Sequence, residues 1–469
     1  MSCGSLGAKD YCLAFAVLII PGLALYEVGG RVPFDRVENR RQHAKSGRVF
    51  HGNASNYLEV LKQLTAGDTL LLEPGEYGET KESSGLLLFH LNGSDGKPIT
   101  ISGLEAGPRP VFLGQPDRNT VRIGDSSFLI LRHLDLDGRN QPGIDAIKSE
   151  DVSHHITIDD LTIRNYQGDQ GDVGISTKAP AWDWVIRNTR IQDVGTGMYL
   201  GNSDGQAPFV RGLIECNVVV GTIGYNIQIK HQNPRPDVPG IPVGPSATII
   251  RRNVFDKSKG GARGHMSRPN LLIGHFPPAG PGMDDVYEIY GNLFYQNPTR
   301  ECLLQGEGNV ALYANVFFNP LGSAICIQPH NDVPREIHVF HNTVVARDNG
   351  IRITGGDPRS RQVVQANAVF ALTPIFALRQ SGNIARDFAD ARKYLSRPQG
   401  NLGDLDLYPL PGKLKGAALS LGQTEHFHDA SLDFNGEQYQ KSFRGAYSGE
   451  GNNPRKLPAA GQSLCHASE

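Results

Sequence analysis

The stretch 286–320, VYEIYGNLFYQNPTRECLLQGEGNVALYANVFFNP, contains two copies of a short block, YGNLFYQN at 290–297 and YANVFFNP at 313–320. In each copy an Asn is followed by apolar residues at alternating positions, which is the period-2 pattern of a β-strand. The two Asn residues, Asn292 and Asn315, are 23 residues apart. That length suits three short strands and three turns, which together make one coil of a stacked structure.

The same block recurs along most of the chain. Its third position is occupied in turn by His133, Asp160, Asn188, Asn217, Asn253, Asn292, Asn315, Asn342 and Asn367, at spacings of 23 to 39 residues. A recurring unit of this length is typical of a solenoid, and the strand pattern predicts an all-β, parallel β-helix. We expect the seven Asn residues to stack in one column, because Asn tolerates the left-handed conformation of a tight turn and its amide can bond to the coils above and below.

Composition agrees with this fold class and excludes some functions. Gly makes up 55 of 469 residues, well above a typical share of about 7%, which argues against a helix-rich protein. Lys and Arg number 46 and Asp and Glu 48, so no basic excess exists to bind nucleic acid. The six cysteines form no C-x-x-C motif, and we expect small buried hydrophobic residues rather than a zinc or redox site.

The N-terminal residues 1–30 are interpreted as a signal peptide or a membrane anchor. Residues 11–26 are apolar but contain Pro21, and they fall short of the roughly 20 residues of a standard membrane span. We therefore expect a secreted or periplasmic protein, with anchoring by this segment as the alternative.

Together with the repeat, residues 55–77, SNYLEVLKQLTAGDTLLLEPGEY, resemble the start of the pectate-lyase-like, right-handed parallel β-helix superfamily. The resemblance implies a capping helix from Tyr57 to about Leu64, with Asn56 and Glu59 as a capping box. The predicted β-helix covers 45–375. Residues 376–450, with a helical pattern at 385–395, are expected to supply C-terminal coils and a capping segment, and 451–469 a loose tail.

The outward face of the first sheet is the substrate-binding surface in polysaccharide-binding members of that superfamily. Alternation in NIQIK at 226–230 predicts that Ile227 and Ile229 point inward and that Lys230 points outward. The expected outward row consists of Tyr199, Asn226, Gln228, Lys230, Asn270, Gln305, Gln328 and Arg352. Amides, a Tyr and cations suit a sugar chain with hydroxyls and carboxylates, although any β-helix must also have a solvated polar face.

Long loops adjoin this row at 231–247, 257–269 and 275–286, where the repeat spacing rises to 36 and 39 residues. Such loops are often functional, but surface loops also tolerate length cheaply. They contain the candidate side chains His231, Arg235, Arg263, His265, Arg268, His275, Asp284 and Asp285.

NIQIKHQN at 226–233 resembles, at its Lys and strand pattern, the motif that carries the catalytic base in the chondroitinase B and alginate lyase family. The resemblance implies Lys230 as the base that removes the proton next to a uronate carboxylate. LLIGH at 271–275 resembles the family's Arg-bearing motif, but Gly274 stands in the place of the Arg. Arg263 or Arg268 is the candidate replacement. The family's acidic calcium ligands are also missing at the matching strand, so we expect no cofactor, with calcium as the unsupported alternative.

The sequence thus predicts a monomeric, exported protein that acts on an acidic polysaccharide by lyase or uronate-epimerase chemistry. Lys230, His231, Arg263, His265, Arg268 and His275 are the catalytic candidates, and Tyr199, Asn226, Gln228, Arg235, Asn270, Gln305 and Gln328 the binding candidates. A glycoside hydrolase is a weaker alternative, because Asp284 and Asp285 are adjacent and are expected to point apart. A non-catalytic polysaccharide-binding protein is the other alternative.

Overall fold

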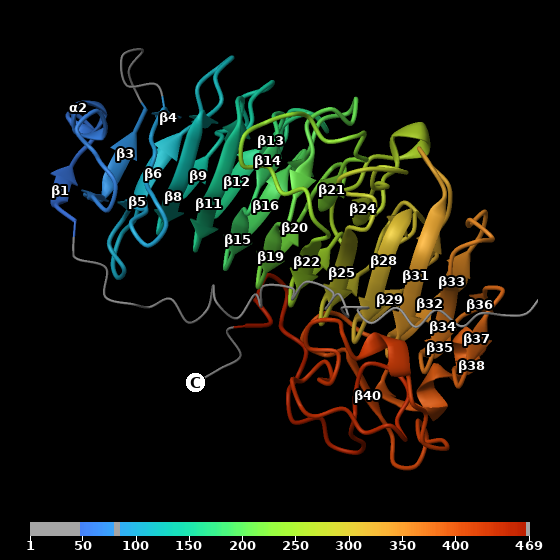
Figure 1. Cartoon of the computed structure of the whole chain (residues 1–469). Helices are drawn as coiled ribbons and strands as arrows, with labels where there is room; N and C mark the ends of the chain where they lie inside the picture. Colours follow the sequence, from blue (N-terminus) through green and yellow to red (C-terminus); the bar gives the residue numbers. More distant parts are fainter. Residues whose placement is uncertain (1–46, 79–84, 466–469) are drawn as a thin grey trace, which may run out of the picture. The chain divides into compact units, whose positions relative to one another are not determined.

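The computed structural model describes residues 47–78 and 85–465, and these form a right-handed parallel β-helix (Figure 1). Three long sheets, here named A, B and C, run along the stack, and every strand pair in them is parallel. The predicted all-β solenoid is confirmed. The N-terminal segment at residues 1–30 lies outside the described residues.

Each coil contributes a strand to each of the three sheets. Sheet A contains β1 Val49–Gly52, β2 Thr69–Leu72, β5 Ile99–Ser102, β8 Ser126–Arg132, β11 Ser153–Asp159, β14 Ala181–Trp182, β15 Val185–Arg187, β18 Phe209–Val210, β19 Leu213–Glu215, β22 Ala247–Arg251, β25 Val286–Tyr290, β28 Gly308–Tyr313, β31 Pro334–Phe340, β34 Gln362–Gln365 and β37 Gln380–Ser381. Sheet B contains β3 Gly75–Tyr77, β6 Pro110–Leu113, β9 Asp135–Asp137, β12 Thr162–Tyr166, β16 Arg190–Val194, β20 Val218–Val220, β23 Val254–Asp256, β26 Leu293–Tyr295, β29 Val316–Asn319, β32 Thr343–Ala346, β35 Ala368–Phe370 and β38 Ile384–Arg386. Sheet C contains β4 Leu86–Phe89, β7 Val121–Gly124, β10 Ile147–Ser149, β13 Val173–Thr177, β17 Thr196–Leu200, β21 Ile227–Ile229, β24 Leu271–Ile273, β27 Leu304–Gly306, β30 Ile325–Ile327, β33 Asn349–Ile353 and β36 Thr373–Phe376.

The core consists of inward-facing apolar side chains that repeat at the same register in successive coils. Along sheet C, for example, Ile175, Met198 and Ile227 are paired in register and fully buried. Because side chains alternate between the two faces of a strand, the intervening residues point away from the core. The strand predicted within 226–230 lies in this sheet as β21, Ile227–Ile229.

The predicted Asn column exists and is a hydrogen-bonded ladder. From Asn217 to Asn367, each Asn amide donates to the Oδ1 atom of the Asn in the next coil at 2.9–3.0 Å. Asn383 extends the ladder beyond the predicted members, at 3.1 Å. The prediction was wrong for Asn188, whose amide bonds to Asp159, because Thr189 occupies the ladder register and donates its backbone N–H to Asn217.

The left-handed residue in this turn is the one before the ladder position. Asn188, Cys216, Arg252 and Ala314 have φ between 50° and 58°, whereas the ladder Asn residues are not among the residues with positive φ. The Asn side chains therefore serve to pair buried backbone groups, and the expectation that Asn itself adopts the left-handed conformation is corrected.

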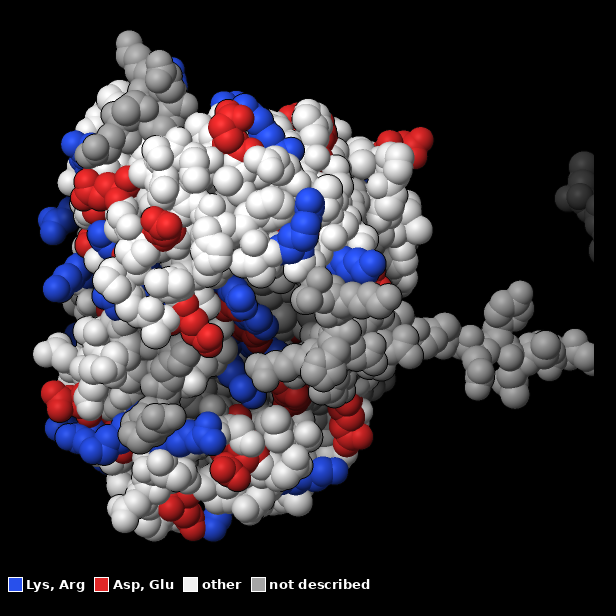
Figure 2. Space-filling view, turned by 90° about the vertical axis from the view of Figure 1, so that its left-hand side faces the viewer, with Lys and Arg blue, Asp and Glu red and all other residues white. Residues whose placement is uncertain are grey.

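The N-terminal end of the core is covered by the short helix α2, Tyr57–Leu61, as the resemblance implied. Tyr57, Val60 and Leu61 are buried against the first coils. The expected capping box does not form, because the Asn56 side chain accepts a hydrogen bond from the Asn53 N–H and Glu59 pairs with Lys62. Figure 2 shows the molecule from this N-terminal end, where acidic and basic side chains are intermingled.

The C-terminal region packs on the outer face of sheet B instead of capping the end of the stack. The coils continue past residue 375 to β38, and the expected helix at 385–395 is a 3₁₀ helix, Phe388–Lys393. Leu407, Leu414, Ala446 and Tyr447 are buried in an apolar cluster with the sheet B residues Val254, Leu293, Val316 and Phe370. The last coil leaves Leu372, Phe376 and Leu378 70%, 56% and 94% exposed. Pro374 lies within the edge strand β36 and has no N–H to donate to a further strand.

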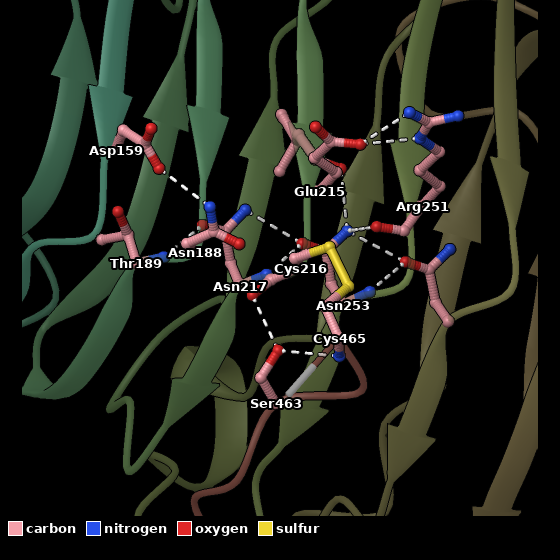
Figure 3. The surroundings of a disulfide bond; sticks show 12 residues. Asp159, Asn188, Thr189, Glu215, Cys216, Asn217, Arg251, Asn253, Ser463 and Cys465 are labelled. Atoms are coloured by element: carbon pink, nitrogen blue, oxygen red, sulfur yellow. Dashed lines mark hydrogen bonds and ion pairs between the residues drawn. A yellow bond between two sulfur atoms is a disulfide. The ribbon is translucent and has the colours of Figure 1, made fainter. Parts of the chain in front are cut away.

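Two disulfides correct the expectation that the cysteines are simple buried hydrophobes. Cys302 pairs with Cys326 one coil away, and Cys216 pairs with Cys465 across 249 residues of sequence. Figure 3 shows Ser463 and Cys465 approaching the turn at Cys216, where the Ser463 hydroxyl donates to the Cys216 carbonyl oxygen at 3.0 Å. The segment 451–465 is therefore fastened to the coils and is not a loose tail. Cys3 and Cys12 lie outside the described residues.

Candidate active site

The outer face of sheet C carries two rows of side chains. The first row joins residues that are paired in register, and the predicted Tyr199, Gln228, Gln305 and Arg352 all belong to it. The second row follows the last paired residue of each strand and contains Lys178, Gly201, Lys230, Gly274, Glu307 and Gln328. Lys230 is partly exposed and lies outside the core, as predicted.

Lys230 has glycine neighbours in the coils on both sides. A Cβ atom on Gly274 would lie 2.3 Å from the backbone nitrogen of His231, and one on Gly201 would lie 3.2 Å from the Lys230 Cβ. Gly201 also has a φ of 88°, a conformation that favours glycine. These glycines leave the sides of Lys230 free of other side chains at its own row.

The ring of Tyr199 contacts two lysines of this row. The Nζ atom of Lys178 is 3.4 Å from the ring centroid and that of Lys230 is 5.7 Å from it. Among the described residues, neither Nζ atom has a hydrogen-bond or ion-pair partner. Burial lowers the pKa of both amines, that of Lys178 to about 8. Lysines with lowered pKa values can act as bases near neutral pH.

Two histidines lie one residue beyond the row of Lys230, and a glutamate lies in that row. His231 and His275 are stacked with their ring centroids 5.3 Å apart. The His275 Nδ1–H donates to the Phe276 carbonyl oxygen at 2.9 Å, whereas His231 Nδ1 is buried with no partner among the described residues. Burial, together with the neighbouring charges of His275 and Lys230, lowers the pKa of His231.

Glu307 is a structural residue in this arrangement. Its carboxylate accepts the backbone N–H groups of His275, His330, Asn331 and Asp332 at 2.7–3.3 Å. It thereby fixes the turn that carries His275. Its carboxylate is also the charge that opposes the lowering of the Lys230 pKa.

Three residues predicted to bind substrate are structural. Asn226 and Asn270 are fully buried in the turn before their strands, where their amides donate to backbone oxygens. The strands begin one residue later than alternation alone suggested, so these amides do not reach the outer face. Arg235 is buried in an ion pair with Asp285, which holds the 231–247 loop against the 275–286 loop.

The 231–247 and 275–286 loops follow the sheet C strands β21 and β24. The 257–269 loop precedes β24 and therefore lies at the other end of the sheet C strands. Its Arg268 guanidinium is 5.8 Å from the Tyr225 ring centroid and donates to the carbonyl oxygens of His265 and Ser267. Gln170 donates to the Met266 carbonyl oxygen at 2.6 Å. Arg263 and His265 are exposed on this loop. The long loops therefore flank the row of Lys230 at both strand ends, as predicted.

Sequence reasoning missed Lys178, Tyr225 and Glu307. A signal for Lys178 was present, because VGISTK and NIQIK both end their strand with a Lys at the same register. No comparable signal exists for Glu307, because its role depends on N–H groups from two turns.

The arrangement offers amines and imidazoles in place of a carboxylate pair. Asp285 is engaged by Arg235, Glu307 by four N–H groups, and Asp145 accepts the Ser176 hydroxyl at 2.8 Å. Asp284 is exposed in the loop. Glycosidases of the usual kind need two carboxyl groups facing one another across the scissile bond. In the described ranges, 47–78 and 85–465, no group of three His, Cys, Asp or Glu residues could hold a metal ion.

Comparison with known proteins finds similarity only among solved structures. No family model and no curated protein matches the chain. The chain is similar to the pectate lyase Pel9A, at 12% identity and a TM-score of 0.45 over 87% of this chain and 98% of that one. It is also similar to a variant of the PL6-family alginate lyase AlyGC, at 14% identity and a TM-score of 0.47 over 71% of this chain and 51% of that one.

A glycoside hydrolase is found as well, the GH136 lacto-N-biosidase from Eubacterium ramulus, at 11% identity and a TM-score of 0.37 over 73% of this chain and 68% of that one. Similarities of this size carry no functional argument, and the fold rests on the sheets and their register. No helix in the described part of the chain is long and apolar enough to cross a membrane. With three parallel sheets, a covered N-terminal end and an Asn ladder, the chain is a right-handed parallel β-helix.

Proposed function

We propose that this protein is an exported polysaccharide lyase that cleaves a uronate-containing chain by β-elimination, with Lys230 as the base. The observation that carries the proposal is the unpartnered Lys230 amine on the outer face of sheet C, with a pKa lowered by burial. Its neighbours in the coils on both sides, Gly201 and Gly274, carry no side chain that could pair with the amine.

The reaction balances with groups that this face supplies. The neutral Lys230 amine takes the proton next to the uronate carboxylate, the electron pair forms a carbon–carbon double bond, and the glycosidic C–O bond breaks. The leaving oxygen receives a proton from solvent, with the His231 imidazole as a hydrogen-bond donor to it. A general base contributes about 10²- to 10⁴-fold to such a step.

Two further observations support parts of the proposal. The disulfides Cys216–Cys465 and Cys302–Cys326 are typical of oxidising, exported environments and support export. The exposed Arg263 and the Arg268 guanidinium beside Tyr225 are the proposed contacts to carboxylates of neighbouring sugar units.

The test is turnover of a panel of polyuronates, followed by the ultraviolet absorbance of the unsaturated product. We expect activity on at least one acidic polymer and none on neutral glycans. Lys230→Ala should lower kcat by about 10²- to 10⁴-fold. Lys97→Ala is the control for the loss of a lysine charge, because Lys97 is exposed.

Other outcomes select the alternatives. Proton exchange without chain cleavage would indicate an epimerase, and binding without turnover would indicate a non-catalytic protein. Full activity in Lys230→Ala would refute the assignment of the base.

A further inference from the structure

We infer that Lys178 binds the carboxylate of the same uronate unit whose proton Lys230 removes, so that two lysines on either side of Tyr199 share charge neutralisation and proton abstraction. This inference rests on the proposed function and extends it to the recognition of the substrate carboxylate by an amine in place of a metal ion or an arginine.

The two lysines occupy equivalent places two coils apart. Lys178 follows Thr177 and Lys230 follows Ile229, and both of these residues are in register with Leu200 between them. Neighbouring strands are about 4.8 Å apart, which places the two backbones roughly 10 Å from each other. A sugar unit lying along the stack over Tyr199 would reach both amines.

Both amines lack a counter-ion. The carboxylate charge that acts on Lys178 is that of Asp145. Asp145 already accepts the Ser176 hydroxyl at 2.8 Å and the Val173 N–H at 3.1 Å, and it lies 3.9 Å from Lys148. On the far side of Lys230, Glu307 accepts four backbone N–H groups. Partly buried charges are costly without a partner, so a substrate carboxylate would supply what the protein leaves out.

The contacts of Tyr199 divide the roles between the two amines. At 3.4 Å from the ring centroid, the Lys178 ammonium gains a cation–π contact that favours its charged form, whereas Lys230 is 5.7 Å away. A carboxylate bound at Lys178 would hold that residue protonated. The ammonium–carboxylate pair is neutral, so Lys230 remains the amine without a charged partner, with a pKa lowered by burial.

Charged groups on every neighbouring strand enter this balance. The pKa of Lys178 is lowered to about 8, chiefly by burial; Asp145 opposes this lowering, and Lys148 and Lys230 add to it. Above this pH the free protein loses the Lys178 charge. We therefore expect binding of an acidic oligosaccharide to weaken as the pH rises through about 8.

The experiment compares charge-conserving and charge-removing variants at both positions. Binding of a defined oligouronate and kcat/KM on the polymer are measured for Lys178→Arg, Lys178→Met, Lys230→Arg and Lys230→Met. Arg keeps the charge but cannot act as a base. The exposed Lys97→Met is the control for net charge, and thermal unfolding confirms that each variant folds.

We expect Lys178→Met to weaken binding about 10- to 100-fold, the usual consequence of losing a charged hydrogen bond. Lys178→Arg should retain binding, and its binding should no longer weaken through pH 8. Both Lys230 variants should bind but lack turnover.

Three results would overturn the inference: unchanged binding in Lys178→Met, loss of binding in Lys178→Arg equal to that in Lys178→Met, or equally strong binding of a neutral oligosaccharide. If the wild-type protein turns over no polymer but binds oligouronates through Lys178, the proposed lyase fails and the carboxylate site stands. If it turns over polymer and Lys178→Met matches the wild type, the lyase stands and the carboxylate site fails.

Discussion

Asn292 shows how one side chain can pair several buried backbone groups at once. Its Nδ2 atom donates to the carbonyl oxygens of Ile250 and Tyr290 and to Asn315 Oδ1, while its Oδ1 atom accepts the Asn253 N–H. Buried polar groups without partners cost about 1–3 kcal/mol each. The ladder therefore stabilises the turn in every coil that contains it.

We predict that Asn292→Leu lowers the free energy of unfolding by at least about 1–3 kcal/mol, because it leaves these groups unpaired. Denaturant unfolding followed by circular dichroism measures the loss. Asn383→Leu is the matched control, since Asn383 is only partly buried at the end of the ladder. An equal loss in both variants would contradict the role of the ladder interior.

Lys257 is a buried lysine that organises the loop beside the candidate site. Its Nζ atom donates to the carbonyl oxygens of Gly224 and Arg268 at 2.7 and 2.9 Å. Burial lowers its pKa from 10.5 to about 7, with Glu301 opposing the shift and Arg268 adding to it.

We predict that Lys257 makes stability rise with pH above about 7. The unfolded chain binds the Lys257 proton up to a pH of about 10.4 while the folded chain has lost it, so the slope is positive and at most about 1.4 kcal/mol per pH unit. Urea unfolding at several pH values should show the wild type gaining stability relative to Lys257→Met. The exposed Lys259→Met is the control, and parallel pH profiles for all three proteins would refute the prediction.

At the scale of elements, the C-terminal segment covers the part of sheet B where the outer residues are apolar instead of charged. The early strands present Asp135, Asp137 and Arg164, which form ion pairs with one another. From β20 onward the row that contains Asp135 presents Val218, Val254, Leu293 and Val316. The apolar part requires a cover, and the segment after β38 provides it.

The last part of the C-terminal segment, residues 450–465, is here called the strap. It extends this cover back along the stack, and the Cys216–Cys465 disulfide fastens its end. We predict that replacing both cysteines by Ser lowers stability by about 2–4 kcal/mol and exposes the strap to proteases. Limited proteolysis with mass analysis measures the release of the strap. The paired Cys302→Ser and Cys326→Ser variant should leave the strap protected, because that disulfide joins neighbouring coils. Early cleavage of the strap in the wild type would show that the disulfide does not hold it.

At the scale of the whole molecule, the three sheets have different surroundings. Much of the outer face of sheet B is covered by the C-terminal segment, whereas sheet C keeps lysines, a Tyr and amides on its outer face. The long loops flank sheet C at both strand ends. In the proposed function, the polymer would lie along the outer face of sheet C.

We predict that lyase activity survives chelation by EDTA, because amines neutralise the substrate carboxylate in the proposed site. Activity of the wild-type protein with EDTA, and after adding back calcium, measures this. Loss of activity with EDTA and its recovery with calcium would show that a metal ion takes part.

The sequence by itself determined the β-helix, the sheet that carries Lys230 and most of the Asn ladder. These features are periodic, and each coil repeats the same local requirement for apolar residues inward and a paired polar group at the turn. Period-2 alternation within one strand was enough to place Tyr199, Gln228 and Lys230 on the outer face. Alternation did not predict the positions of Asn188, Asn226 and Asn270. A shift of one residue along the chain decides whether a side chain belongs to a strand or to a buried turn.

Only the tertiary structure decided the contacts between distant segments. Lys178 meets Tyr199 because strands of successive coils pair in register, and Arg235 meets Asp285 because two loops pack together. Cys216 meets Cys465 across 249 residues of sequence. Each of these pairs depends on how coils and loops of unequal length stack, and no local pattern encodes that stacking. The proposed chemistry depends on the same stacking, since it places two lysines on either side of one Tyr ring.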